Sequence, residues 1–136
     1  MQHSFDYAVL RVVPRVERLE FLNAGVIVFS LQNDYLEAKI QVDENRLKAF
    51  WPELDIDLIR RHLEALQRIC TGDPEAGPIA KLPRRERFHW LVSPRSTIIQ
   101  VSPVHTGICI GDPQQITERL FRQLVATDAD PVTSAS

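Results

Sequence analysis

The sequence predicts an α+β domain, and the order of its apolar patterns supports this prediction. The first third of the chain contains β-branched, apolar segments of strand length, and the middle third changes to the spacing of amphipathic helices. One more strand and one more helix follow. Strands first and helices next are typical of an antiparallel or mixed sheet. We therefore expect about four strands, with three or four helices packed mainly on one face of the sheet.

Three segments form the first part of the predicted sheet. Residues 5–14 (FDYAVLRVVP) and 24–31 (AGVIVFSL) are apolar on both alternating faces, as in inner strands that are covered on both sides. Residues 35–42 (YLEAKIQV) alternate between apolar and polar, which predicts a hairpin partner with one wet face. Residues 16–23 fit either a helical turn or a loop.

The middle of the chain has helical spacing. Asp43 suits the cap of a short helix over residues 43–51. Residues 55–70 carry apolar side chains at i, i+3 and i+4, with Arg and Glu opposite, and predict the main helix. The Gly- and Pro-containing residues 73–83 are typical of a surface loop. Residues 83–92 fit a short helix or an irregular run into a strand, and we favour the helix.

The last strand and helix are marked by their flanking residues. Residues 96–102 (STIIQVS) predict a strand bracketed by two Ser-Pro pairs. Asp112 suits the cap of a final helix, and Pro113 suits its first turn. We expect one domain over residues 1–126, followed by a small, polar and flexible tail at 127–136.

The composition and motif content exclude several classes of protein. The chain has 136 residues, is 44% hydrophobic and has a formal net charge of −2, which argues against a dedicated polyanion binder. It contains no HExxH, no Cys/His set with zinc spacing, and no GxxxxGK[ST], GxGxxG or GxSxG. Cys70 and Cys109 are too few for a disulfide framework. We expect a cytoplasmic protein with no membrane span, metal or cofactor.

One segment (RFHWLVSPRSTIIQVSPVHTG) concentrates polar residues around a short apolar run. Gln100 either faces solvent with Ser102 or points with Ser102, His105 and Thr106 into a shared pocket. In the second case Arg95 would hold an anionic group. His105 would then act as acid or base, and it is the one candidate catalytic residue.

The basic residues before this strand allow two further interpretations. Residues 81–95 interleave Arg87 and its basic neighbours with Trp90. Arginine beside an aromatic side chain suits stacking on nucleic acid, and equally suits the anchor of a protein interface. A solvated basic face with its aromatic side chains in the core is the structural alternative.

Arg11 is unusual because it lies within an otherwise apolar strand. A buried arginine needs a partner, since an unpaired buried charge destabilises the fold. Glu20 and Glu37 are the candidate partners. The alternative is that Arg11 lies at the exposed end of its strand.

The segments YAVLRVVPRVERLEFLNAGVIVF, RFHWLVSPRSTIIQVSPVHTG and LFRQLV resemble the DUF3037 family, small bacterial proteins of unknown function. The resemblance spans roughly residues 5–125. The usual Gly before the Glu of the family's ERGEF pattern is Leu19 here. The motif positions are Tyr7, Arg11, Pro14, Glu20, Asn23, Gly25, Arg95, Gln100, Ser102, Pro103, His105 and Thr106. If the first strand and the 96–102 strand are neighbours, several of these polar residues converge into a buried network or a ligand site.

The resemblance implies no known activity, but it suggests a partner. Genes of this family often lie beside genes for HipA-like serine/threonine kinases, an association typical of a toxin–antitoxin-like or phosphorylation module. We therefore expect a protein-interaction or regulatory module rather than an enzyme, with Arg87, Trp90 and Arg95 on its binding face. The alternatives are a binder or enzyme for a small anionic ligand, using a polar pocket around Arg95 and His105, and a nucleic-acid binder using residues 81–95.

Overall fold

The computed structural model describes residues 2–94 and 97–127, without the Cys109 side chain. In this part of the chain an antiparallel sheet of five strands forms the centre, in the order β3-β2-β1-β4, with β5 also paired to β1. The strands are β1 (Gln2–Val12), β2 (Leu22–Ser30), β3 (Tyr35–Ile40), β4 (Ile99–Val101) and β5 (His105–Ile110). The helices are α1 (Glu44–Phe50), α2 (Ile56–Thr71), α3 (Arg84–Leu91) and α4 (Pro113–Leu124).

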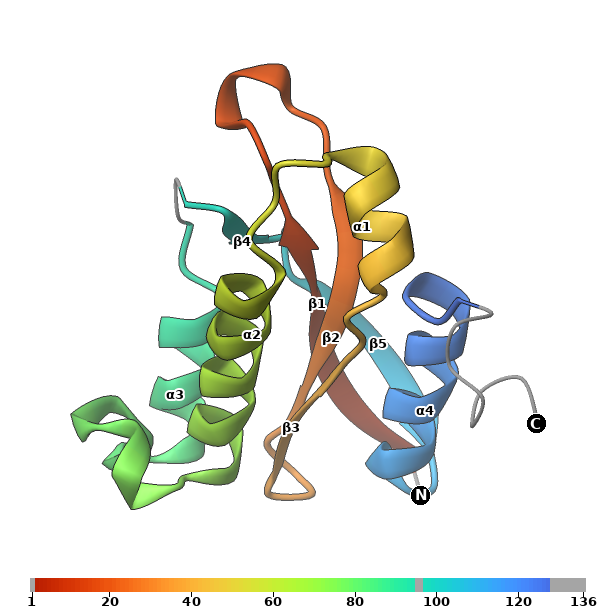
Figure 1. Ribbon diagram of the computed structural model, residues 1–136. Helices are drawn as coiled ribbons and strands as arrows, with labels where there is room; N and C mark the ends of the chain where they lie inside the picture. The colour runs from red at the N-terminus through yellow and green to blue at the C-terminus, as the bar shows by residue number, and fades with distance from the viewer. Residues whose placement is uncertain (1, 95–96, 128–136) are drawn as a thin grey trace.

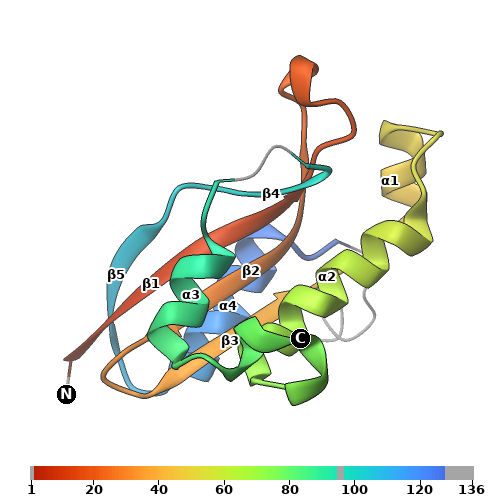
Figure 2. The same cartoon turned by 90° about the vertical axis from the view of Figure 1, so that its left-hand side faces the viewer.

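The helices cover both faces of the sheet (Figures 1 and 2). On one face, Leu47 of α1, Leu63 of α2 and Phe88 of α3 join the apolar cluster of the sheet. On the other face, α4 packs Leu120 and Phe121 in a second cluster. The predicted α+β class is confirmed, with one strand more than expected. Three helices lie on one face, as predicted, and α4 lies alone on the other.

The predicted caps Asp43 and Asp112 are present, and Asp55 is a third cap that was not predicted. Asp43, Asp55 and Asp112 each accept a hydrogen bond from a backbone N–H in the first turn of α1, α2 and α4. Such bonds satisfy amide groups that have no partner inside the helix. The favoured helix over residues 83–92 is confirmed as α3. No helix among the described residues has the length and apolar character needed to cross a membrane.

The pairing of β1 with β2 is irregular near the end of β1, just before the loop that connects the two strands. Leu10 lies opposite Gly25, whereas the next residue, Arg11, lies opposite Asn23. Ala24 is therefore the additional residue of a β-bulge, which increases the local twist. Beyond the bulge the connection contains a short 3-10 helix, Val16–Arg18. The tip of the hairpin extends beyond the helices, next to the end of α1 (Figure 1).

The strand predicted at 96–102 is shorter than expected, and β5 was not predicted. Ser102 separates β4 from β5 and bonds across to β1: its N–H donates to the Val9 oxygen at 2.9 Å, and its Oγ accepts from the Val9 N–H at 2.8 Å. The same Oγ donates to the Pro103 oxygen at 2.9 Å. The side chain of Ser102 thus replaces a missing backbone group in the ladder. Of the tail predicted at 127–136, Thr127 is described and bonds to Gln41 and Asp43, whereas residues 128–136 lie outside the described residues.

Candidate functional site

A cavity of about 280 Å³ lies beside the β1–β2 hairpin. Arg11 and Gln100 lie at its base, because they are directly paired across β1 and β4. The hairpin loop supplies the remaining wall. We call this cavity the hairpin pocket; it is lined by Arg11, Val13, Val16, Leu19, Phe21 and Gln100.

Arg11 has an aromatic partner, and no acidic partner among the described residues. Its guanidinium carbon lies 4.0 Å from the centre of the Phe21 ring. Its Nε is buried without a hydrogen-bond partner, and none of the described residues forms an ion pair with Arg11. The predicted pairing with an acidic residue is wrong: Glu20 binds Arg18 at 2.5 Å, and Glu37 accepts from the Tyr35 hydroxyl at 3.0 Å.

The rim of the hairpin pocket is unusually apolar for a loop. Val16 and Phe21 are each 42% exposed, and Leu19 is 81% exposed. Leu19 also has a φ of 59°, a left-handed conformation in which an L side chain is strained. The chain therefore holds a strained leucine in solvent at the entrance to the pocket, where a polar residue or glycine is usual.

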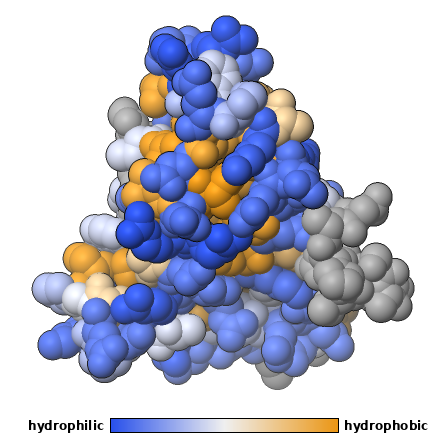
Figure 3. Space-filling view, in the orientation of Figure 1, coloured by the Kyte–Doolittle hydropathy of each residue, from blue (hydrophilic) through white to orange (hydrophobic). Residues whose placement is uncertain are grey.

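Polar residues surround this apolar rim at the hairpin tip. Ion pairs join Arg15 to Glu17 at 3.2 Å and Arg18 to Glu20 at 2.5 Å. Arg15 and Arg18 also approach the Trp51 ring, at 5.6 and 6.0 Å from its centre. On the face seen in Figure 3 the tip is mostly hydrophilic, and hydrophobic surface gathers beneath it. These contacts hold the loop against the end of α1.

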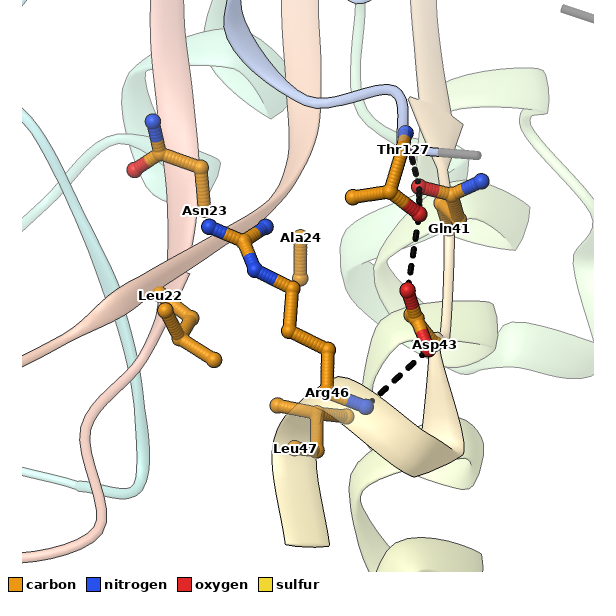
Figure 4. Close-up of a pocket in the computed structure, with 8 residues that line it drawn as sticks. All are labelled: Leu22, Asn23, Ala24, Gln41, Asp43, Arg46, Leu47 and Thr127. Atoms are coloured by element: carbon orange, nitrogen blue, oxygen red, sulfur yellow. Dashed lines mark hydrogen bonds between the residues drawn. The ribbon is translucent and has the colours of Figure 1, made fainter. Parts of the chain in front are cut away.

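Asn23 lies at a second, much smaller cavity of about 10 Å³ (Figure 4). Its Nδ2 donates to the Leu124 oxygen at 3.0 Å, which attaches the end of α4 to β2. Thr127 donates to Gln41 and to Asp43 across the same cavity. The Thr127 hydroxyl, followed by the Arg46 N–H, lowers the pKa of Asp43. The hydrogen bonds around this cavity attach the residues after α4 to the sheet. A space of this size holds at most about one water molecule and does not bind a larger ligand.

The polar residues predicted around the last strand lie in different surroundings. Gln100 donates to the Thr97 oxygen at 3.1 Å beside the hairpin pocket, whereas Ser102 is buried and bonded to the backbone. His105 is exposed, with its ring centre 5.2 Å from that of Tyr7. Thr106 donates to Asp6 at 2.7 Å. Arg95 lies outside the described residues, so its predicted approach to His105 stays a prediction.

Arg87 and Trp90 also have different surroundings. Arg87 is 8% exposed, and its Nη1 donates to the Ala80 oxygen at 3.2 Å, so it fastens α3 to the preceding turn. It is not available on an outer face. Trp90 is 38% exposed. Burial raises the pKa of the Cys70 thiol to about 12, more than the charge of Arg87 lowers it, which disfavours the reactive thiolate.

The apolar wall of the hairpin pocket was missed by the sequence analysis. Arg11 and Gln100 were selected as candidates, but Val16, Leu19 and Phe21 were not. Their signal was present in VERLEFL, where apolar residues recur within a segment that fits a loop. Among the described residues, no group of three His, Cys, Asp or Glu side chains is arranged to hold a metal ion.

The comparisons with known proteins identify a family. The family model for DUF3037, described as a protein of unknown function, matches residues 7–125. No curated protein and no solved structure gives a significant match. The matched range includes the hairpin pocket and all strands except the first residues of β1. The chain therefore belongs to the DUF3037 family.

Proposed function

We propose that this protein is an interaction module that binds a protein partner through the hairpin pocket. The observation that carries the proposal is Arg11, which lines a cavity with an exposed apolar rim and forms no ion pair among the described residues. A charge-assisted hydrogen bond to arginine is stronger than a neutral one. A partner carboxylate in the pocket would supply the opposite charge that Arg11 lacks.

The chemistry of the pocket selects a carboxylate next to an apolar side chain. The Arg11 guanidinium carbon lies 4.0 Å over the centre of the Phe21 ring, and a guanidinium covered by an aromatic ring can still donate hydrogen bonds in its own plane, along an edge. A carboxylate accepts two parallel bonds from such an edge. Val13, Val16 and Phe21 provide an apolar wall for the neighbouring group of the partner. An Asp, a Glu or a chain-terminal carboxylate beside a hydrophobic residue fits both requirements.

The size of the pocket favours a protein segment over a large cofactor. Its volume of about 280 Å³ is just below the range of about 300–1,000 Å³ that is typical of small-molecule sites. One or two side chains of a partner fill such a space. The exposed Leu19 and Phe21 beside an arginine also resemble the aromatic, aliphatic and arginine anchors that dominate interface energetics.

The first partner to test is a HipA-like kinase. The support for this choice is the neighbourhood of genes in the family that the chain resembles, together with the absence of standard catalytic motifs from the sequence. A small anionic ligand is the second candidate, because Arg11 would bind a free carboxylate by the same bonds.

A tagged pull-down from the native cell, with nuclease treatment and mass spectrometry, tests the proposal. Arg11→Gln removes the charge, and Leu19→Asp makes the rim polar. Their matched controls are Arg61→Gln on the exposed side of α2 and Leu31→Asp in the β2–β3 turn, where Leu31 is 64% exposed. We expect a stoichiometric partner that both pocket variants lose and both controls retain.

Two results would overturn the proposal. One is a partner retained by both pocket variants, which would place the interface elsewhere. The other is a wild-type protein that captures no partner from the extract and does not capture a co-expressed HipA-like kinase. In that event, ligand-dependent thermal shifts with acetate, glutamate and short acidic peptides would distinguish a small-ligand site from an inactive pocket.

A further inference from the structure

The outer edge of β5 is a second exposed surface, and it differs in kind from the hairpin pocket. Within the described residues β5 pairs with β1 alone, by the register from Tyr7↔His105 to Gln2↔Ile110. Figure 2 shows β5 at the margin of the sheet, with no drawn helix beyond it. In an antiparallel strand, alternate residues direct their N–H and C=O groups away from the paired neighbour. The outer side of β5 therefore presents a row of backbone donors and acceptors.

This edge lacks the features that normally protect an edge strand. Natural sheets place Lys, other charged residues or Pro on their edges to prevent pairing with another chain. The opposite edge follows this rule, because β3 carries Glu37 and Lys39, and Lys39 binds Glu118 at 2.6 Å. The residues of β5, HTGICI, include no Lys, Arg, Asp, Glu or Pro. The sheet is thus protected at one edge and unprotected at the other.

Apolar side chains flank the unprotected edge. Ile108 is 69% exposed and Ile110 is 74% exposed. They lie on the same face of the strand because they are two residues apart. Val104, just before β5, is 43% exposed. An edge with free backbone groups and β-branched apolar side chains has both components needed to add a strand.

We propose that β5 pairs with β5 of a second copy of this chain, antiparallel and about a two-fold axis normal to the sheet. Such an axis keeps each face of the sheet on the same side, so Ile108 and Ile110 of one copy meet the same residues of the other. The four isoleucines form one apolar cluster across the joint. The two sheets become one continuous sheet.

Self-complementarity and the absence of charge favour a second copy over a foreign strand. With the two-fold axis at residue 109, Ile108 of one copy lies opposite Ile110 of the other, and the reverse, so the edge matches itself. Because β5 carries no charged residue, this pairing brings no like charges together. A charged edge would instead indicate a partner of opposite charge, and the residues of β5 provide no such pattern.

The proposed pairing leaves the hairpin pocket free. The β5 register covers the first half of β1, from Gln2 to Tyr7, whereas Arg11 pairs with β4 near the other end of β1. A dimer would therefore present two hairpin pockets. The two proposals rest on different residues, and either one can fail without the other.

Sedimentation velocity over a series of protein concentrations tests this inference on the full chain. We expect a concentration-dependent species of twice the monomer mass. Ile108→Lys and Ile110→Lys place like charges beside each other at the joint and should each weaken dimerisation by about tenfold or more. Leu31→Lys, at another exposed leucine, is the matched control and should leave the dimer unchanged.

A second measurement keeps the test independent of folding defects. Hydrogen exchange should show protection of the β5 amides that increases with protein concentration in the wild type and not in Ile108→Lys. Circular dichroism verifies that the variants keep the native fold. A wild type that stays monomeric at high micromolar concentration would overturn the inference. So would a dimer that both lysine variants keep, or β5 protection that depends on another protein.

Discussion

The hairpin pocket and the β5 edge both expose apolar side chains, but they do so by different means. The pocket is made of side chains around one cation, Arg11, with the strained Leu19 at its rim. The β5 edge is made of backbone groups flanked by Ile108 and Ile110, without charge. In our proposals the first discriminates between partners by chemistry, whereas the second pairs with its own copy. The two proposals thus assign recognition and self-assembly to separate surfaces.

Strand β1 contributes to both surfaces. The two surfaces differ because α4 covers only part of one face of this strand. Alternate residues of β1 from Phe5 to Arg11 face the side of the sheet that α4 covers. Phe5 and Tyr7 pack with the α4 cluster. Arg11 lies farther along the strand, next to the bulge and the hairpin. The hairpin loop, rather than a helix, covers this end of the face.

The largest effect is expected where β5 is attached to β1. A Cβ added at Gly107 would lie 2.5 Å from Cζ and 2.8 Å from Cε1 of the Phe5 ring. Gly107→Ala therefore forces the buried ring or the strand to move, at a cost of about 2 kcal/mol. Urea denaturation measures this loss of unfolding free energy. The dimer should weaken as well, because its edge is displaced, while binding to the hairpin pocket continues.

Ile108→Ala is the control for this change. It alters the adjacent residue, whose side chain is mostly in solvent, and should change the unfolding free energy by less than about 0.5 kcal/mol. Equal costs for the two variants would mean that Phe5 does not hold β5 in place.

The second effect concerns Ser102, which lies between the two regions. Ser102→Ala leaves the Val9 N–H without its acceptor in a buried position, which costs about 1.5 kcal/mol. In this variant the amide exchange rates of β4 and β5 should increase over the wild type more than those of the hairpin. Ser93→Ala removes an exposed side-chain bond to the His89 oxygen and should have a smaller effect. A uniform increase across the sheet would contradict this local role.

The third effect separates binding from stability at Arg11. Arg11→Met keeps an unbranched side chain against Phe21 and removes the buried Nε that has no partner. The lost cation–π contact, about 0.5–1 kcal/mol, and the relieved desolvation oppose each other. Since a buried donor without an acceptor costs about 1–3 kcal/mol, the unfolding free energy should rise by about 1 kcal/mol. Partner capture should be lost.

Arg61→Met is the control, since Arg61 is exposed on α2, and it should keep both stability and binding. A clear loss of stability in Arg11→Met would show that Arg11 fastens the hairpin. Its position would then be structural, and the pocket would lose its main support.

The accuracy of the sequence-based predictions followed the length of each pattern. The long apolar strands and the main helix were predicted because their periodicity extends over many residues. The short run HTGICI was missed because it contains Gly107 and follows a Pro, both of which interrupt strands. The break at Ser102 depends on a side chain that bonds to the Val9 backbone, which no local pattern predicts.

Two of the six residues that line the candidate site, Arg11 and Gln100, were predicted. Arg11 was selected because a charged residue in an apolar strand is a local anomaly. Its actual partner, Phe21, lies across a hairpin whose course depends on the bulge at Ala24 and on the left-handed Leu19. Such contacts are set by tertiary geometry, so the pairing with Glu20 or Glu37 that was expected of a buried Arg11 is not formed.

The smallest effect on stability, at Leu19, gives the sharpest test of the hairpin pocket. Its φ of 59° carries a strain of about 1–2 kcal/mol that glycine would relieve. Glycine also adds about 0.5–1 kcal/mol of backbone entropy to the unfolded chain. Leu19→Gly should therefore raise the unfolding free energy by about 0.5 kcal/mol. Partner binding should weaken by about tenfold, because the most exposed apolar side chain of the rim is lost.

The matched control is Asp34→Gly in the β2–β3 turn, where φ is 53°. Asp34 binds Arg84 at 2.8 Å, but both side chains are largely exposed, so the loss of this pair costs little. The unfolding free energy of this control should be similar to that of Leu19→Gly, and its partner binding should be unchanged. If Leu19→Gly binds as well as the control, the strained leucine does not contact the partner, and only Arg11 would remain to define the site. If it loses binding while gaining stability, the strain at Leu19 is retained for recognition, because folding alone would favour its removal.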